Sequence, residues 1–162
     1  MSACIKFPVG EYVATVDADD RDLVAAYHWH AARRPNTVYV AHSKPRPARG
    51  MLLLHRVVCA APPGVEVDHR DGNGLNNRRA NLRLATSGQN KANSRKRGGT
   101  TSQYKGVSWF QRTGKWHAEI QAHGQRHYLG YFYEETEAAA AYDAAAIEIW
   151  GEFAQVNLHG RR

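Results

Sequence analysis

The chain has 162 residues, of which 43% are hydrophobic and 23% charged, and it carries a formal net charge of +7 at pH 7. This length accommodates one domain or two small ones, and the apolar fraction is sufficient for globular cores. No apolar run approaches the roughly 18 residues of a membrane-spanning helix, so we expect no membrane partner, whereas the basic excess favours a polyanionic one.

The two cysteines, Cys4 and Cys59, form no CxxC pair. We therefore expect a reducing environment, thiols that act as small apolar side chains, and no structural zinc. No positively charged start followed by an apolar segment is visible at the N-terminus, so a cytoplasmic location is the expectation.

Residues 1 to 50 are expected to form a β-rich supporting region. The predicted elements are a strand or hairpin over residues 7–16, an acidic turn over 17–22, a short helix over 23–32 and a strand over 37–41. Pro45 and Pro47 then predict a loop, in which Lys44, Arg46 and Arg49 are candidates for facing a polyanion.

Residues 51 to 66 are strongly apolar up to two consecutive prolines, and the polar pair His55 and Arg56 interrupts the apolar run. Two interpretations of His55 stay open. It either supports a functional site or phosphate contact, or it is a hydrogen-bonded histidine of the core.

The stretch from Val67 to Asn93 combines turn-forming residues with a compact set of polar side chains. Its pattern predicts a strand, a loop, a second strand, and a helix that starts near Thr86, with Gln89 completing a capping box. Asp68 and His69 end the first strand, where successive side chains face opposite sides.

These residue types suit a hard divalent cation. Mg²⁺ takes oxygen ligands and keeps several waters, so the carboxylate of Asp68 and the carboxamide of Asn90 form a sufficient protein contribution. His69, on the other side of the strand, is the candidate general base, and a neighbouring cation would keep it neutral at pH 7. The alternative is that these Asp, His and Asn residues serve turns and helix caps.

The stretch resembles the HNH (ββα-metal) endonucleases, specifically the H-N-N subgroup of homing and phage enzymes. Asn81 lies twelve residues after His69, and Asn90 nine residues further, within the matching pieces DGN, LNNR and NLR. The resemblance covers about residues 50 to 95. It implies His69 as general base, Asp68 and Asn90 as ligands of Mg²⁺ or Mn²⁺, and Asn81 as the residue that braces the loop and orients the histidine. Asn93 is a rival ligand one turn along the helix.

Positive charge is concentrated at this motif. Residues 68 to 97 contain eight Lys and Arg against two Asp. The overlap favours contacts with DNA phosphates over a generic solvated surface. The candidates are Arg78, Arg79, Arg83, Lys91, Arg95, Lys96 and Arg97. Residues 98–102 follow as a Gly- and Ser/Thr-containing linker, either an uninvolved tether or one that tracks the DNA backbone.

Residues 103 to 162 predict three short strands, with turns at Thr113-Gly114 and Gly124. A helix from about Thr136 to Trp150 follows, ended by Gly151. Residues 103–133 carry four basic and one acidic group, whereas residues 134–152 carry six acidic groups and no basic ones. A nucleic acid is therefore expected to meet the sheet rather than the helix.

This segment resembles the plant APETALA/ethylene-response-factor DNA-binding domain in the pieces YKGV, GKWHAEI, LGYF and GEFAQVN. The resemblance implies a three-stranded sheet in the DNA major groove with the helix behind it. The implied DNA contacts are Lys105, Arg112, Trp116, Glu119, Gln121, Arg126 and Tyr128. Ser108 replaces a usual arginine and Tyr128 a usual tryptophan, so the plant target sequence is not transferred.

Together these expectations describe an α+β chain. The predicted parts are a supporting region (1–50), a ββα-metal nuclease core (51–97), a linker (98–102) and a three-stranded antiparallel sheet packed on one helix (103–162). The predicted function is a metal-dependent, nicking endonuclease of double-stranded DNA, monomeric by default, in a bacterial or phage-infected cell. The alternative is a catalytically inactive, sequence-specific DNA-binding regulator.

Overall fold

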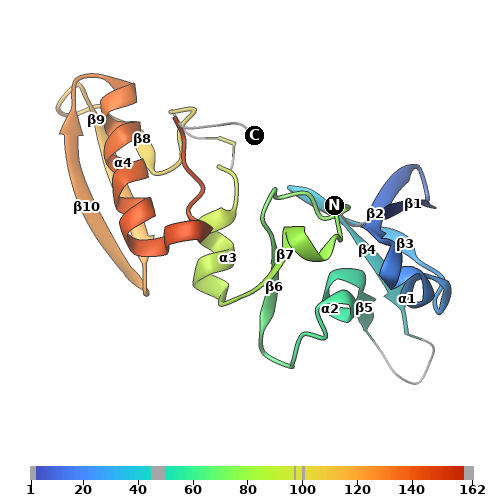
Figure 1. Ribbon diagram of the computed structural model, residues 1–162. Helices are drawn as coiled ribbons and strands as arrows, with labels where there is room; N and C mark the ends of the chain where they lie inside the picture. The colour runs from blue at the N-terminus through green and yellow to red at the C-terminus, as the bar shows by residue number, and fades with distance from the viewer. Residues whose placement is uncertain (1–2, 45–49, 97, 100, 159–162) are drawn as a thin grey trace. The chain divides into compact units, whose positions relative to one another are not determined.

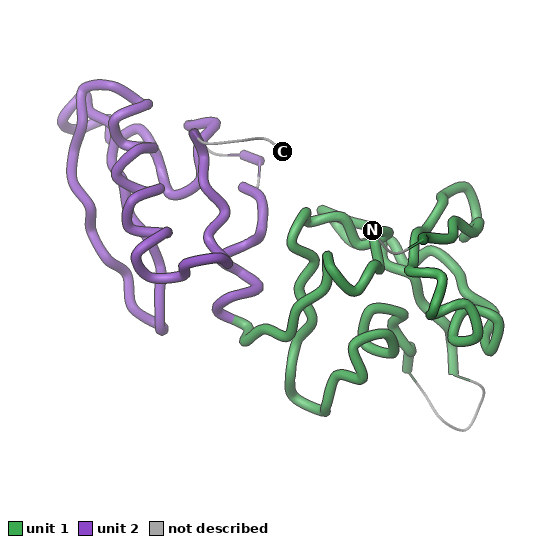
Figure 2. Tube along the Cα trace, in the orientation of Figure 1, with its two compact units in different colours: residues 1–87 green, residues 88–162 purple. Residues whose placement is uncertain are grey.

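The computed structural model describes residues 3–44, 50–96, 98–99 and 101–158 (Figure 1). The chain divides into two compact units, Met1–Ser87 and Gly88–Arg162 (Figure 2). Both units mix helices with small antiparallel sheets, which confirms the α+β class. No helix in the described part of the chain combines the length and hydropathy needed to cross a membrane.

The first unit begins with an antiparallel hairpin of β1 (Cys4–Val9) and β2 (Tyr12–Asp17). A short helical segment follows, formed by η1 (Ala18–Asp20) and α1 (Arg21–Ala25). Three strands then form a sheet in the order β3-β4-β5: β3 (His30–Arg34), β4 (Thr37–Ser43) and β5 (Met51–Leu53). The supporting region is thus β-rich, as predicted.

The prediction of a helix over residues 23–32 is wrong beyond residue 25. α1 ends at Ala25, and His30–Arg34 forms β3 instead. Because the chain reverses at Pro35 and Asn36, β3 pairs along its whole length with β4, from His30 opposite Ala41 to Arg34 opposite Thr37. These ladder hydrogen bonds outweigh a weak local helical pattern.

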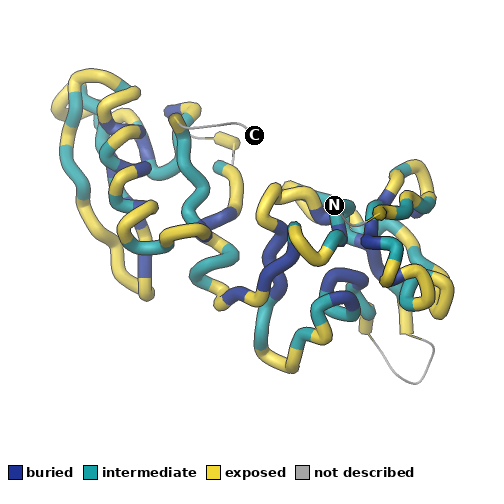
Figure 3. Tube along the Cα trace, in the orientation of Figure 1, coloured by how far each residue is buried: buried dark blue, intermediate teal, exposed yellow. Residues whose placement is uncertain are grey.

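The rest of the first unit carries the strand-loop-strand motif. It consists of α2 (Leu54–Val58), β6 (Glu66–His69), η2 (Arg79–Asn81) and β7 (Leu82–Ala85), and β6 pairs antiparallel with β7. Val67 and Leu82 join the core cluster with Val16, Val40 and Leu54. Most residues of β6 and β7 are buried (Figure 3).

The second unit begins within α3 (Ser87–Asn93), which starts directly after Thr86 as the capping pattern predicts. A sheet in the order β10-β9-β8 follows, built from β8 (Val107–Phe110), β9 (Lys115–Ala122) and β10 (Gln125–Phe132). α4 (Glu135–Trp150) lies along one face of this sheet (Figure 1), and η3 (Gly151–Phe153) follows it. The predicted strands and helix are confirmed, including the end at Gly151, whose φ of 52° suits a glycine.

Small side chains let α4 approach the sheet closely. Ala138 and Ala139 pack with Val107 and Ala118, and Tyr142 packs with Ile120. The division between the two compact units falls after Ser87, the first residue of α3, so the rest of this helix groups by its contacts with the second unit.

Candidate active site

Asp68 and His69 sit side by side at the end of β6 and are both buried, at 4% and 5% exposure. The antiparallel register puts Asp68 opposite Arg83 and His69 opposite Leu82 on β7. Because successive strand residues face opposite sides, the carboxylate and the imidazole have different surroundings.

The carboxylate of Asp68 forms a buried ion pair with Arg83. The Nε and Nη2 atoms of Arg83 each lie 2.8 Å from Oδ2 of Asp68. A buried carboxylate needs a charged partner to offset its lost hydration, and the opposing strand supplies one. The side chain of Arg83, predicted to contact phosphate, is therefore buried against Asp68 instead.

The imidazole of His69 lies in a pocket of rings and amides. Its Nε2 is 3.5 Å from Oδ1 of Asn77, the outer limit of a hydrogen bond, and its centroid is 5.8 Å from that of Tyr39. Burial lowers the pKa of His69 and outweighs Asn77 and the nearby aspartates, which raise it. The ring is therefore neutral at pH 7.

His55 lies directly beside this candidate base. The two imidazole centroids are 5.0 Å apart, and His55 also packs edge-on against Tyr39. Burial, followed by the electrostatic influence of His69 and Arg56, lowers the pKa of His55 to about 3. Its buried Nδ1 has no hydrogen-bond partner among the described residues. His55 is thus a neutral core ring in contact with the site, but not the hydrogen-bonded core histidine of the second interpretation.

Asn81 braces the loop that joins the two strands. Its Nδ2 donates to Oδ1 of Asp71 (2.9 Å) and to the carbonyl of Asn76 (2.8 Å), and its Oδ1 accepts from the amide of Asp71 (3.2 Å). These bonds hold the loop, whereas the carboxamide beside Nε2 of His69 is that of Asn77 rather than that of Asn81. Nothing in the sequence distinguishes Asn77 from the other carboxamides of this loop.

Asn77 is itself firmly held. It is fully buried, its amide donates to the carbonyl of Thr15 (2.7 Å), and its Nδ2 donates to the carbonyl of Gly74 (3.3 Å). The N-terminal hairpin therefore anchors the loop residue that orients the imidazole.

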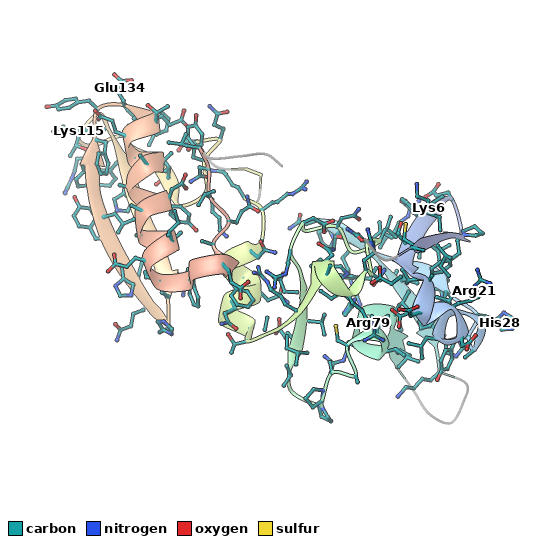
Figure 4. The ribbon with its side chains drawn as sticks, viewed as in Figure 1. Lys6, Arg21, His28, Arg79, Lys115 and Glu134 are labelled. Carbon is teal, nitrogen blue, oxygen red and sulfur yellow. The ribbon has the colours of Figure 1, made fainter. Side chains whose placement is uncertain are left out.

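Arg78 and Arg79 are also tied to the N-terminal region. The Nε of Arg78 lies 2.9 Å from Oδ1 of Asp17, and Nη2 of Arg79 lies 2.6 Å from Oδ1 of Asp20. The side chain of Arg79, labelled in Figure 4, is still 56% exposed, whereas that of Arg78 is 31% exposed. Both arginines border a depression of about 570 Å³ that also includes Asn81 but neither Asp68 nor His69.

The other predicted ligand, Asn90, is half-buried on α3, and its rival Asn93 is buried there. Most of α3, including Asn90, groups with the second unit, whereas Asp68 and His69 lie in the first. Among the described residues, no group of three or more His, Cys, Asp or Glu side chains is arranged to hold a metal ion.

The basic residues after α3 differ in their surroundings. Lys91 and Arg95 are exposed, whereas Nζ of Lys96 donates to the carbonyl of Tyr104 (2.9 Å), and burial lowers the pKa of this lysine. Arg97 lies outside the described residues, as do Arg46 and Arg49.

The expected linker is attached to the second unit where it is described. Thr101 Oγ1 accepts from the amide of Trp109 (2.8 Å), and the buried Ser102 accepts from the amide of Tyr104 (2.9 Å) through its hydroxyl. These contacts do not fit a freely moving tether.

The sheet of the second unit has one face on α4 and one open face. Along β9, Ala118, Ile120 and Ala122 are buried toward the helix, so the alternate positions lie on the open face. The cross-strand register places four predicted DNA contacts together there: Glu119 opposite Tyr128, and Gln121 opposite Arg126.

Aromatic rings that the sequence did not single out share this open face. His117 stacks with Tyr128 (centroids 5.5 Å apart) and contacts Tyr131 (5.4 Å), which in turn stacks with Phe110 (5.2 Å). Two-residue alternation from Glu119 back to His117 is the signal that could have identified this group.

Three other predicted contacts lie elsewhere. Trp116 shares the helix-facing side and packs against the Val107–Ala118–Ala138–Ala139 cluster. Nζ of Lys105 is engaged with backbone carbonyls at the end of α3. Arg112 lies in the turn after β8, with its guanidinium 5.5 Å from the ring centroid of Phe110.

Comparison with known proteins locates the same two regions. A family model described as HNH endonuclease matches residues 52–92. An uncharacterised HNH endonuclease of Acanthamoeba polyphaga mimivirus is 32% identical over 150 residues, which covers 89% of this chain and 74% of the viral protein. Protein 3.8 of Escherichia phage T7 is 39% identical over 66 residues, covering 41% of this chain and 54% of the phage protein.

The second region has plant relatives. The APETALA2-like protein 2 of Oryza sativa subsp. indica is 44% identical over 59 residues, covering 36% of this chain and 14% of the plant protein. The viral relative, by contrast, matches most of both chains, and the family model spans β6, β7 and most of α3. The buried imidazole of His69 and the strand-loop-strand motif agree with these matches. The chain belongs to the HNH endonuclease family and is a nuclease.

Proposed function

We propose that the chain is a metal-dependent endonuclease that nicks double-stranded DNA, with His69 as general base and the sheet of the second unit as the DNA-reading surface. The observation that carries this proposal is the state of His69. Its imidazole is buried at the end of β6 with Asn77 beside Nε2, and burial lowers its pKa, which favours the neutral form at pH 7. A base in this form accepts a proton from water at pH 7.

Asp68 and Asn90 are the proposed ligands of the divalent ion. Their oxygen donors fit a hard cation such as Mg²⁺ or Mn²⁺, which binds one or two protein groups and fills its remaining positions with water and phosphate. When bound, the ion supplies stabilisation of the charge on the leaving 3′ oxygen. Arg83 would hold the Asp68 carboxylate in place, since its Nε and Nη2 both contact the oxygen Oδ2.

DNA recognition is proposed for the open face of the sheet. Arg126 and Tyr128 are exposed on β10, and the adjacent turn contributes Arg112. The helix side carries the acidic groups, so the electrostatic field favours approach of a phosphate backbone from the sheet side.

The alternative function is a DNA-binding regulator that does not cut. The observation in its favour is the Asp68–Arg83 ion pair, in which a guanidinium occupies one oxygen of a proposed ligand. The intact set of Asp68, His69, Asn81 and Asn90 supports catalysis.

A plasmid-nicking assay with and without Mg²⁺ separates the two. The unaltered chain should convert supercoiled plasmid to the open circle with Mg²⁺ and not with a chelator. His69→Ala should keep its DNA affinity and cut about 10²–10⁴-fold more slowly. Equal cutting by this variant would remove the base assignment, and an unaltered chain that binds but never nicks would favour the regulator.

A further inference from the structure

Lys105 closes the C-terminal end of α3 from a distant part of the chain. Its Nζ donates to the carbonyls of Lys91 (3.1 Å), Ala92 (2.6 Å) and Ser94 (2.8 Å). The last four carbonyls of an α-helix have no partner within the helix, and a cation there is favourable. The ammonium of Lys105 therefore adds a cationic donor to carbonyls at the end of α3, of which that of Lys91 also accepts from Ser94 and that of Ala92 from Gln155.

The backbone of Lys105 is clamped by Asn157. The amide of Lys105 donates to Oδ1 of Asn157 (2.8 Å), and Nδ2 of Asn157 donates to the carbonyl of Lys105 (3.1 Å). Asn157 is in turn held by Asp143 of α4, whose buried carboxylate accepts from the Asn157 amide (2.7 Å). A continuous chain of hydrogen bonds thus runs from α4 through Asn157 and Lys105 to α3.

Gly106, the residue after Lys105, restricts the path of the backbone at this point. Gly106 has a φ of +74°, and a Cβ atom at this position would lie 2.0 Å from the ring of Tyr142 on α4. The chain therefore passes Tyr142 closely, which fixes where the side chain of Lys105 begins.

Two further bonds tie α3, and the segment directly after it, to the rest of the second unit. The amide of Gln155 donates to the carbonyl of Ala92 (3.2 Å), and Nζ of Lys96 donates to the carbonyl of Tyr104 (2.9 Å). α3 has seven residues, a length at which an isolated helix is unstable in water. Its order therefore depends on such tertiary contacts.

We propose that Lys105 is a positioning residue of the nuclease, through which the DNA-reading unit holds the helix that carries Asn90. The inference rests on the proposed function, since it takes Asn90 as a metal ligand. Asn90 directly precedes Lys91, the first residue whose carbonyl Lys105 binds. Contacts that orient a ligand are worth about 10–100-fold in metal affinity or activity when they are removed. In this proposal α3 connects DNA recognition with cutting, because it carries the metal ligand Asn90 and is held by Lys105 of the DNA-reading unit.

The test compares Lys105→Met with the unaltered full chain. Methionine keeps most of the apolar stem and removes the three donors. The Mg²⁺ concentration for half-maximal nicking should rise about 10–100-fold, with the rate largely restored at saturating metal. Without any metal, amide exchange in residues 88–94 should speed up, whereas exchange in β8, β9 and β10 should not. Affinity for duplex DNA should stay unchanged.

Lys6→Met is the matched control, because Lys6 is exposed on β1 (Figure 4). It removes the same charge and should leave both the metal requirement and the exchange of α3 as they are. Lys105→Gln serves if the Met variant unfolds, since a carboxamide still donates to carbonyls. It should show a smaller rise in metal requirement.

Three results overturn the proposal. Weaker DNA binding with an unchanged metal requirement would make Lys105 a DNA contact. Faster exchange in α3 with an unchanged metal requirement would make it a structural cap without a role in catalysis. An unaltered chain that never nicks removes the proposed function, and the catalytic role of Lys105 with it, whereas the exchange measurement would still show whether Lys105 holds α3.

Discussion

Arg83 and Asp68 form a buried ion pair across β6 and β7, with two guanidinium nitrogens 2.8 Å from one carboxylate oxygen. Removing one partner of such a pair leaves an uncompensated charge in the interior. Arg83→Met should therefore lower the free energy of unfolding by about 3–5 kcal/mol, measured by urea denaturation. Arg126→Met, which removes an arginine whose side chain is 73% exposed, should change it by no more than about 0.5 kcal/mol. Equal effects would mean that the Arg83–Asp68 pair is not buried in solution.

The contact between Asn77 and His69 predicts a positioning effect on catalysis. Asn77→Ala removes the carboxamide beside Nε2, so the imidazole loses a contact that helps to orient it. A misplacement of about 1 Å can cost about 10²-fold in rate, and we expect a loss of that order in single-turnover cleavage at saturating Mg²⁺. Because Asn77 is buried, DNA affinity should not change. A full-rate Asn77→Ala variant would show that another group orients the imidazole.

His55 predicts how stability depends on pH. The folded protein protonates this ring with a pKa of about 3, whereas the unfolded chain does so near 6.5. Between these values the unfolded chain binds the extra proton, so stability falls as the pH drops through 6.5 toward 3, by about 1.4 kcal/mol per pH unit in the middle of this range.

His55→Phe is the variant that isolates this effect. It keeps a ring against Tyr39 and His69 and sacrifices no hydrogen bond at Nδ1. As the pH falls from 7 to 4.5, the free energy of unfolding of the unaltered protein should decrease more than that of His55→Phe, so the difference between the two should shift in favour of the variant. A difference that stays constant over this range would contradict the buried, neutral state of His55.

The two faces of the C-terminal sheet predict opposite phenotypes. Tyr128 is 60% exposed on the open face, so Tyr128→Ala should leave unfolding unchanged and weaken DNA binding, by about 1–3 kcal/mol if the ring contacts a base. Trp116 packs on the helix side, so Trp116→Ala should destabilise the protein by about 2–4 kcal/mol. Mobility shifts and thermal melts of both variants check this, and the reverse pattern would exchange the roles of the two faces.

The contacts of α3 predict which truncated fragment of the chain keeps the second unit stable. A fragment of residues 88–162 keeps the carbonyls that Lys105 and Gln155 bind, whereas a fragment of residues 98–162 loses them. The shorter fragment should be less stable by about 2 kcal/mol or more, because a half-buried ammonium would lose its acceptors. Equal melting temperatures would show that α3 is not part of the folded unit.

The sequence by itself determined the local elements. β6, the turn-rich loop, β7 and the start of α3 follow from short-range signals: alternating apolar residues, Asp-Gly and Asn-Gly turns and a capping threonine. The same holds for β8, β9, β10 and α4. The contact of Asn81 with Asp71 is also a local one, because both residues lie in the same loop.

Tertiary structure decided what the charged side chains do. Arg79 reaches an aspartate 59 positions away, and Lys105 meets carbonyls 11 to 14 positions away, so neither partner is visible in a local pattern. β3 likewise exists because β4 approaches it. A charge run indicates attraction to a polyanion, but long, flexible cationic side chains bind whichever acceptor the folded chain brings within reach, and only packing of distant segments determines which acceptor that is.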